Sequence, residues 1–408
     1  MINGESKKGF RLIAMAYRAK PVDPAVPLVQ QVDGLVFVAI VGMTDPLRSG
    51  IAATIARCRR AGIRPVMITG DHPLTAQKIA DESGLDGSSK TLLTGADLDE
   101  MSDATLAKAV KKTAVYARVE PRHKVRIVEA LRRNGEVVAM TGDGVNDAPA
   151  LKMADIGIAL GSGTDVAKET ADIVLLDDSF ETIVEAIHGG RVIFDNIRKV
   201  LVYLLSKSGP ELILVGGAML ASLPLPVLAV QILWVNIVQD ALPSLALAAD
   251  PEESAVMTEP PTGRQTPLLT SAHLWLMGTV TVVTDFGLLA LFNYLLHTNL
   301  PLPTIQTTMF AALALSSLAI IFSCRSFRRS LFEYNPFTNW QVNGAVAVGV
   351  LLVFAAVYVP LFQSLLHTVP LDLSAWGMIA AVAIGNVLVI ESMKLVFRTR
   401  LQRQSVLA

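Results

Sequence analysis

This sequence of 408 residues has few cysteines and almost no net charge, and each of these features excludes a class of protein. The two cysteines, Cys58 and Cys324, lie far apart with no CxxC or CxH spacing, so neither a disulfide framework nor a zinc site is supported. The formal net charge is −1, and no global field favours nucleic acid as a partner. The N-terminal stretch MINGESKKGFRLIAMAYR has charges where an export signal needs an apolar core, so we expect no cleaved signal peptide.

Charged residues make up only 17% of the chain, whereas 52% of the residues are hydrophobic and the mean hydropathy is +0.48. This composition is too apolar for a soluble protein of this length and indicates a membrane protein. Charged sequence punctuated by glycine runs to about Asp178, and long uncharged stretches dominate from about Val192. We therefore expect a soluble domain followed by a membrane domain.

The membrane domain contains six segments that could cross a lipid bilayer, whose core of about 30 Å needs roughly 20 mostly apolar residues per helix. The connections 223–226, 297–304 and 364–372 contain no Lys or Arg, whereas each of the other connections and the C-terminus contain at least one. The positive-inside rule therefore predicts an integral, multi-pass protein with its soluble domain and C-terminus in the cytoplasm. The predicted spans are approximately 192–222, 226–249, 272–296, 305–324, 341–363 and 373–397.

The first two predicted spans carry polar residues at membrane depth. Ionisable groups cost several kcal/mol there unless they are paired or hydrated, so they indicate an ion path. Pro210 removes a backbone donor from the first span and can free the carbonyl of Ser206 to face a cavity. Hydrogen bonds that merely hold the helices together remain the alternative. The six candidate ion-path residues are Lys207, Ser208, Glu211, Asn236, Gln239 and Asp240.

The soluble domain alternates short β-branched runs with helical patterns, which predicts βαβ units and a parallel sheet covered by helices. Ligands of such α/β domains bind at the carboxyl ends of the strands. We expect strands within 35–42, 63–71, 113–119, 136–143 and 171–178, and helices at 47–61, 73–83, 121–134 and 147–154.

Three motifs at these strand ends predict a site for phosphoryl chemistry. The run Met140-Thr141-Gly142-Asp143-Gly144-Val145-Asn146-Asp147 offers two carboxylates four residues apart, which can hold Mg²⁺ beside phosphate oxygens. Thr69, Gly70 and Asp71 end another strand and offer a hydroxyl and backbone N–H groups. Lys124 begins a helix and supplies positive charge, as phosphoryl transfer requires. Taken singly, the first motif could be an acidic turn and Lys124 a surface lysine.

The order of these motifs resembles the haloacid-dehalogenase-type phosphorylation domain of P-type cation-transporting ATPases, followed by their fifth to tenth membrane helices. The resemblance covers essentially the whole chain and implies a Rossmann-like parallel sheet followed by an all-α membrane domain. It implies the end of a nucleotide-binding domain at 1–20, a partial phosphorylation domain at 21–185 and a transmembrane domain at 186–408. The matching motifs are Asp45-Pro46-Leu47-Arg48, Thr69-Gly70-Asp71, Arg118-Val119-Glu120-Pro121 with Lys124, and Thr141-Gly142-Asp143-Gly144-Val145-Asn146-Asp147-Ala148-Pro149-Ala150-Leu151.

The resemblance also implies roles for single residues, with Mg²⁺ and ATP as cofactors. Asp143 would bind Mg²⁺, with Asp147 in support, and Asn146 and Asp147 would position the phosphoryl group. Residues 9–18 look like the closing segment of the nucleotide-binding domain. The phosphoryl group would be contacted by Thr69, Gly70 and Lys124, and the nucleotide would lie near Asp71 and Arg118.

The family's nucleophile lies in an Asp-Lys-Thr-Gly-Thr motif, and no such string occurs in this sequence. Asp45 follows a hydrophobic run but lacks the partner residues of that motif. We therefore expect that the chain alone neither autophosphorylates nor pumps. The nucleophile's strand is expected to be internal to the sheet, so we predict a marginally folded chain or one that depends on a separate N-terminal half.

Three functions stay open: a pump half made as a split subunit or a truncated reading frame, a membrane-anchored phosphatase, and a non-catalytic regulatory membrane protein. Six helices after the phosphorylation domain favour the calcium, sodium–potassium and proton branches over the heavy-metal branch. The segment from Trp234 to Asp240 is similar to calcium pumps, whereas Lys207 is similar to gastric-type proton pumps. Ca²⁺ or H⁺ is the expected cargo, and one bound cation or exported protons fit better than two Ca²⁺. The expected location is a bacterial plasma membrane.

Overall fold

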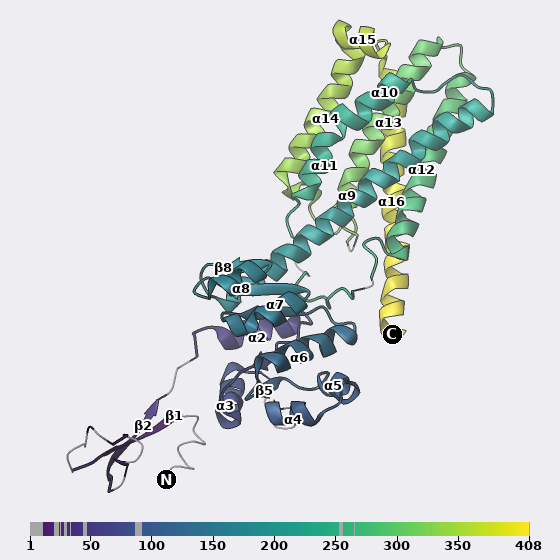
Figure 1. Ribbon diagram of the computed structural model, residues 1–408. Helices are drawn as coiled ribbons and strands as arrows, with labels where there is room; N and C mark the ends of the chain where they lie inside the picture. Colours follow the sequence, from purple (N-terminus) through teal and green to yellow (C-terminus); the bar gives the residue numbers. More distant parts are fainter. Residues whose placement is uncertain are drawn as a thin grey trace. The chain divides into compact units, whose positions relative to one another are not determined.

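The computed structural model in Figure 1 describes residues 11–407 except 20–23, 25, 28–30, 33, 44–46, 86–91, 253–255, 265 and 328, without the side chains of 11, 12, 272 and 396–407. Two compact units emerge: a soluble unit of Met1–His188 with Ser254–Thr266, and a membrane unit of Gly189–Glu253 with Pro267–Ala408. Residues 9, 10, 45 and 46, which the sequence assigned to family motifs, lie outside the described residues.

The soluble unit contains two parallel sheets of three strands each, ordered β3-β5-β4 and β6-β7-β8. The parallel α/β class predicted from the sequence is confirmed. The edge strands β3 and β6 each lead into a Thr-Gly-Asp sequence at their carboxyl end. Among the described strands, each of these two pairs with a single neighbour. The strands are β3 (Met67–Ile68), β4 (Leu92–Thr94), β5 (Val115–Ala117), β6 (Ala139–Gly142), β7 (Ile156–Leu160) and β8 (Ile173–Leu175).

One predicted strand does not join a parallel sheet. The run expected at 35–42 forms β2 (Val36–Met43), which pairs antiparallel with β1 (Arg11–Tyr17) and has a register shift between Met15 and Ala16. The expectation of a βαβ unit at β2 was therefore wrong. Most of β2 is solvent-exposed, so its apolar pattern does not report burial in a parallel sheet.

The helices of the soluble unit include every predicted helix and three that the sequence pattern did not indicate, α4, α5 and α8. Proline at the first helical turn begins both α3 and α6, where its missing N–H costs no hydrogen bond. Helix α6 packs on both sheets, with Ile127 in the cluster around Ile68 and Val128 in the cluster around Met140. The helices are α2 (Ile51–Arg60), α3 (Pro73–Ser83), α4 (Gly95–Glu100), α5 (Asp103–Ala109), α6 (Pro121–Arg133), the 3-10 turn η2 (Val145–Asp147), α7 (Ala148–Met153) and α8 (Asp165–Thr170).

The segment Ser254–Thr266 connects two membrane helices in sequence but packs with the soluble unit. Gly62 has a φ of +70°, and a Cβ there would lie 2.7 Å from the ring of Pro261, so only glycine admits this proline so closely. Arg264 forms an ion pair with Asp155 at 3.3 Å, and Val256 is buried.

Six helices in the described part of the chain are long and apolar enough to cross a membrane. Helix α9 begins in the soluble unit, twelve residues before the predicted start of the span at 192, and continues unbroken through Pro210. The second span contains a π-helical turn, η3, and the fifth ends at Tyr358 because Pro360 starts a separate helix. The elements are α9 (Phe180–Leu220), α10 (Ala229–Leu233), η3 (Trp234–Gln239), α11 (Ala241–Ala248), α12 (Ser271–Leu296), α13 (Leu302–Cys324), the 3-10 turn η4 (Pro336–Thr338), α14 (Trp340–Tyr358), α15 (Pro360–Leu366) and α16 (Leu373–Leu407).

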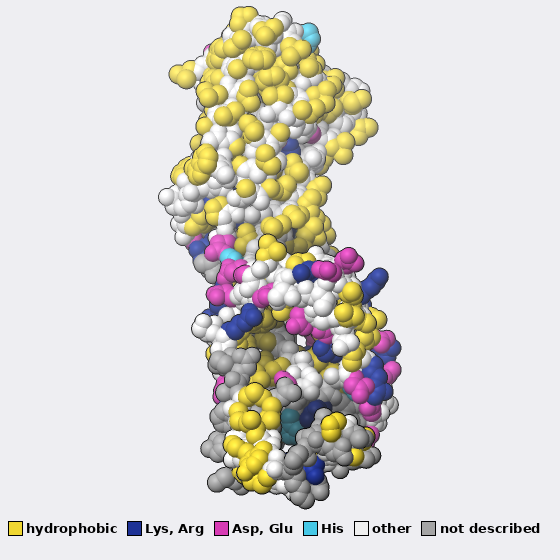
Figure 2. Space-filling view, turned by 60° about the vertical axis from the view of Figure 1, so that its left-hand side comes forward, with side chains coloured by type: hydrophobic (Ala, Val, Ile, Leu, Met, Phe, Trp, Pro, Cys, Tyr) yellow, Lys and Arg dark blue, Asp and Glu magenta, His cyan; other side chains and the backbone are white. Residues whose placement is uncertain are grey.

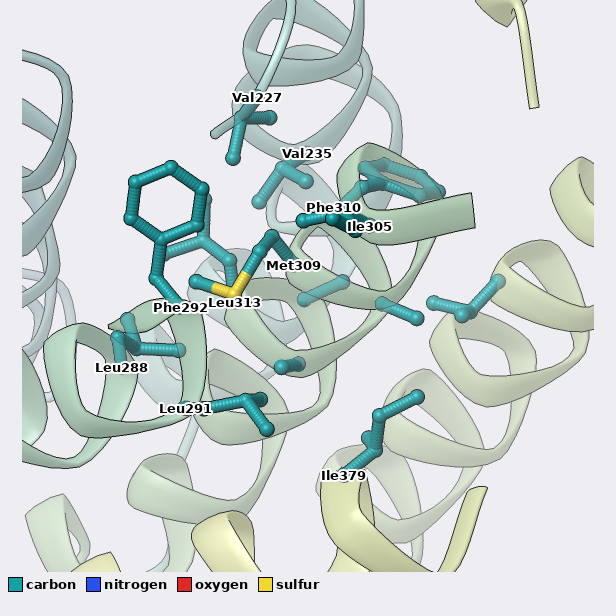
Figure 3. Packing of buried hydrophobic residues seen from close by; sticks show 14 of the residues in the cluster. Val227, Val235, Leu288, Leu291, Phe292, Ile305, Met309, Phe310, Leu313 and Ile379 are labelled. Carbon is teal, nitrogen blue, oxygen red and sulfur yellow. The ribbon is translucent and has the colours of Figure 1, made fainter. Parts of the chain in front are cut away.

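Helix α13 lies at the centre of the membrane unit, and 83% of the residues in its most apolar stretch are buried. Figure 3 shows its residues Met309, Phe310 and Leu313 packed against Phe292 of α12 and Val235 of η3. Hydrophobic side chains cover the surface of the membrane unit in Figure 2, and most charged side chains lie on the soluble unit. This distribution suits a helical bundle that faces lipid.

Candidate functional site

Lys124 and Asp147 form the centre of the candidate site in the soluble unit. Nζ of Lys124 lies 2.5 Å from Oδ1 of Asp147, and their side chains are only 18% and 8% exposed. The second carboxylate oxygen, Oδ2, accepts a hydrogen bond of 3.4 Å from the amide of Gly144. A buried carboxylate is thus held by one cation and one backbone donor, which satisfies the requirement that buried charges be paired.

Gly142 is required by the position of Asp147. A Cβ on Gly142 would lie 2.5 Å from Cβ of Asp147, so a side chain there would displace the carboxylate. The following turn η2 folds Asp147 back over the end of β6, since its amide bonds to the carbonyl of Gly144 at 3.0 Å. Asp147 therefore lies directly beside the carboxyl end of strand β6.

Asp143 and Asn146 lie in the same turn and are solvent-exposed. Neither side chain makes a hydrogen bond or ion pair with another described residue. The backbone carbonyl of Asp143 accepts a bond of 2.8 Å from the amide of Thr164, which fixes the backbone while the carboxylate stays open to a ligand. Mg²⁺ commonly takes one or two protein carboxylates and fills its shell with phosphate oxygens and water, and Asp143 suits that pattern. Asp147 fits a supporting role because Lys124 already occupies its Oδ1.

Thr69 and Asp71 contact each other at the end of β3. The Thr69 hydroxyl donates to Oδ2 of Asp71 at 3.0 Å and accepts from the Asp71 amide at 3.1 Å. Gly70 between them has nothing within 4 Å of an added Cβ, so its surroundings are open. The amide of Arg118 donates to the carbonyl of Asp71 at 3.0 Å, so the two residues predicted near ATP are adjacent through their backbones.

Arg118 has a φ of +54°, the left-handed region that costs a non-glycine residue on the order of 1–3 kcal/mol. Its carbonyl oxygen would lie 2.3 Å from a Cβ on Gly95, so glycine is needed for this close approach. The next helix, α6, is anchored by His123, whose Nδ1 accepts from the Glu120 amide at 3.2 Å while Nε2 lies 2.9 Å from Asp99. The hydrogen bond from His123 lowers the pKa of Asp99, and the neighbouring Arg122 adds to this effect.

A second polar site lies in the membrane unit between α9 and the second span. Nζ of Lys207 donates to Oδ1 of Asn236 at 3.0 Å and also forms a very short ion pair with Oδ2 of Asp240. Nδ2 of Asn236 donates to Glu211 at 2.8 Å. Four of the six predicted ion-path residues therefore form one network.

The other two predicted residues point elsewhere. The hydroxyl of Ser208 bonds to the carbonyl of Leu204 on its own helix and is exposed, and the side-chain amide of Gln239 donates to Ala314 at 2.8 Å. The carbonyl of Ser206, which the sequence predicted to be free to face a cavity, accepts a hydrogen bond from the hydroxyl of Thr281 at 3.2 Å. The proline does free this carbonyl, but a neighbouring helix supplies the missing donor.

Two residues of the network were missed by the sequence analysis. The hydroxyls of Tyr203 and Ser317 both lie 3.1 Å from Oδ1 of Asp240, which is only 1% exposed. Tyr203 lies four residues before Lys207, and this helical spacing could have revealed it. Ser317 comes from α13, which contains no charged residue, so only the tertiary structure brings it to the site.

The parallel-sheet unit with its Lys124–Asp147 pair, followed in the chain by six apolar helices among the described residues, suits the class of membrane ATPases that the sequence resembles. Comparisons with known proteins agree. Residues 224–396 match the family described as cation transporting ATPase, C-terminus, and residues 11–155 and 124–187 match haloacid dehalogenase-like hydrolases.

Several proteins similar in sequence to the chain are named calcium-transporting ATPases. A calcium-transporting ATPase of Bacillus subtilis is 41% identical over 376 residues, which are 92% of this chain and 42% of the relative. Calcium-transporting ATPase 1 of Bacillus cereus is 38% identical over 96% of this chain and 46% of its own length, and Calcium-transporting ATPase 1 of Saccharomyces cerevisiae is 37% identical over 99% and 43%. The chain belongs to the P-type cation-transporting ATPases, and it spans less than half the length of these curated relatives.

Proposed function

We propose that the chain carries the ion site and part of the phosphorylation domain of an ATP-driven cation pump, which couples phosphorylation of an aspartate to ion transport. The observation that carries this proposal is the buried network of Lys207, Asn236, Asp240 and Glu211. Lys207 and Glu211 of this network lie on α9, a helix of 41 residues whose first turns belong to the soluble unit. Such a helix can transmit movement of the phosphorylation site to the ion site.

Mg²⁺ and ATP are the cofactors that the soluble site would use. Asp143 would hold Mg²⁺, which neutralises phosphate charge when bound. Lys124 and Thr69 would contact the phosphoryl group, with Gly70 leaving room for it, and Asn146 and Asp147 would position it. Asp71 and Arg118 would lie near the nucleotide. The side chains of Asp143 and Asn146 are exposed and make no bond to another residue in the described part of the chain, which supports this assignment.

The phosphorylated aspartate would come from a separate N-terminal half. Strands β3 and β6 are both end strands, and both pack against α6. A parallel strand ending in Asp-Lys-Thr-Gly-Thr between them would pair with both edges and bring its aspartate to the Thr-Gly-Asp ends. The soluble unit and the C-terminus would lie in the cytoplasm of a bacterial cell, with the membrane unit in the plasma membrane.

Co-expression of the chain with an upstream half tests this function. We expect ATP-dependent, hydroxylamine-sensitive phosphorylation only when both halves are present. Asp143→Asn should abolish it, whereas Asp165→Asn, an exposed change on α8, should not. ATP or phosphate-ester hydrolysis at the same rate with and without the upstream half would contradict the proposal and favour a membrane-anchored phosphatase.

The transported ion would be a single Ca²⁺ or exported protons rather than two Ca²⁺. Lys207 is a built-in cation that neutralises Asp240, so Glu211 remains as the only other acid of the network. A second divalent ion would gain little Coulombic attraction from this set. In the reassembled protein, Ca²⁺ activation should show a Hill coefficient of about 1. A coefficient near 2 would contradict the single site.

A further inference from the structure

We propose that Asp285 is a second ion-binding residue of the membrane unit, which binds and releases a proton at a site separate from the Lys207 network. Asp285 lies in the middle of α12 and is only 5% exposed. Both of its carboxylate oxygens lack a hydrogen-bond partner among the described residues. None of the roles assigned above uses this residue.

Other buried hydroxyls of the membrane unit are also unsatisfied. Oγ1 of Thr284, next to Asp285 in the chain, and Oγ of Ser206 on α9 have no partner in the described structure, and these residues are 3% and 1% exposed. Unsatisfied buried polar atoms are rare in folded proteins, and a carboxylate with both oxygens unsatisfied calls for an explanation such as an unseen ion or water. The carboxylate oxygens of Asp285 can accept a proton, whereas the hydroxyl oxygens can only donate or accept hydrogen bonds.

The position of Asp285 on α12 brings it toward the proline region of α9. Thr281 lies four residues before Asp285, on the same face of the helix. Its side chain contacts α9 twice, since its hydroxyl bonds to the carbonyl of Ser206 and its methyl would lie 2.5 Å from a Cβ on Gly209. Asp285 therefore follows one turn further along the face that α12 presents to α9, where Pro210 interrupts the backbone hydrogen bonds.

No charged group pairs with Asp285 from the described helices around it. On α9, Lys207 and Glu211 are bound within their own network. Helix α13 has no charged residue, and the charged pair of α16 described here, Glu391 with Lys394, is joined at 2.9 Å. His273 on α12 itself bonds to Thr270.

The absence of a counter-charge selects a proton as the ligand. An ionised carboxylate without a partner is costly at membrane depth, and taking up one proton removes its charge completely. A divalent metal would keep an excess positive charge beside a single carboxylate. No group of three or more acidic, His or Cys side chains suited to a metal occurs among the described residues. Asp285 is thus suited to carry one proton as the helices around it move.

Infrared spectroscopy of the full chain in lipid vesicles tests the inference without requiring transport, so its outcome is independent of the proposed pump function. The spectrum of the unmodified chain minus that of Asp285→Asn should show the C=O stretch of a protonated carboxyl at neutral pH. This band should convert to carboxylate bands as the pH is raised, and Asp285→Glu should retain it at a shifted frequency. The matched control, the exposed Asp372→Asn, should show carboxylate bands at neutral pH.

Two results would overturn the proposal. Carboxylate bands for Asp285 at neutral pH would show that it is ionised and paired. Conversion of the protonated band by Na⁺ or Ca²⁺ at constant pH would show that a metal cation, rather than a proton, is the ligand of this site.

Discussion

The stability of the membrane unit depends on the buried ion pair between Lys207 and Asp240. Their side chains are 7% and 1% exposed, and every oxygen of the Asp240 carboxylate has at least one donor. A fully bonded pair of this kind offsets the cost of removing both charges from water. Removal of one partner leaves the other charge buried without compensation.

Lys207→Met should therefore destabilise the membrane unit by about 3–5 kcal/mol, because Asp240 would lose its counter-charge. Thermal unfolding of the chain in detergent micelles measures the effect. The double variant Lys207→Met with Asp240→Leu should recover most of the loss, since no charge then remains at this point. An unchanged unfolding temperature in the single variant would show that water or another cation reaches Asp240.

The residues of both candidate sites could be predicted from the sequence to different extents. Short motifs of fixed chemistry, such as the Gly142–Asp147 run, identified side chains that the structure brings together, including Lys124 with Asp147. Ser317 could not be found in this way, because a serine in an apolar helix has no signal of its own. Asp285 was likewise passed over, since one acid in an apolar span resembles a tolerated exception until the structure shows both its oxygens unsatisfied.

At the level of elements, the turn after β6 depends on one glycine. Gly142→Ala should destabilise the soluble unit by about 1–3 kcal/mol, the usual cost of an extra methyl group in a packed site, and should displace Asp147 from Lys124. The matched control is Gly144→Ala, where the nearest atom to an added Cβ lies at 3.8 Å. Chemical denaturation followed by circular dichroism compares the two. Equal losses in both variants would mean that backbone entropy, rather than the contact with Asp147, sets the cost.

Helix α4 begins with a capping box that makes its stability depend on pH. The Thr94 hydroxyl and amide both donate to Asp97, at 2.6 and 2.7 Å, and the hydroxyl bond is the larger cause of the lowered pKa of Asp97. A lowered folded-state pKa contributes stability above the unfolded value of about 3.9, and this contribution is lost as the pH falls through the folded pKa.

Thr94→Ala should therefore cost about 1 kcal/mol at pH 7, and the difference from the unmodified chain should narrow below about pH 4. Urea denaturation at several pH values measures both. The control Glu100→Gln, an exposed change on the same helix, should leave the profile unaltered. A cost for Thr94→Ala that stays constant down to pH 2 would show that Asp97 is not part of the cap.

The elements themselves were predicted where periodicity and length agreed, as in α3 and in the six apolar helices. The antiparallel pairing of β2 could not be predicted, because a β-branched run has the same pattern in either kind of sheet. Short elements such as β4 and α4 have too few residues to show a period. The break at Pro360 follows from the fixed φ of proline, but Pro210 leaves α9 continuous because Thr281 satisfies the freed carbonyl.

At the scale of the whole molecule, the edges of β3 and β6 that no other described strand pairs with indicate what the soluble unit can bind. Unpaired strand edges invite pairing with another strand. Co-expression with an upstream half should slow hydrogen exchange in 63–71 and 136–143 on the order of tenfold, as expected for newly formed backbone hydrogen bonds. Mass spectrometry measures the exchange, and the outer strands β4 and β8 provide the internal control. Protection of all four strands alike would indicate general stabilisation rather than insertion of a strand.

The chain passes between its two units three times, after His188, after Glu253 and after Thr266. A protease that cuts only after His188 leaves residues 254–266 in the membrane fragment, so the soluble unit loses its covalent link to a segment that packs with it. Complete separation of the residues of the two units requires three cuts, one on each side of the Pro261 segment and one in α9. Any attempt to study the soluble unit alone must therefore include residues 254–266 as a separately supplied peptide or a grafted loop.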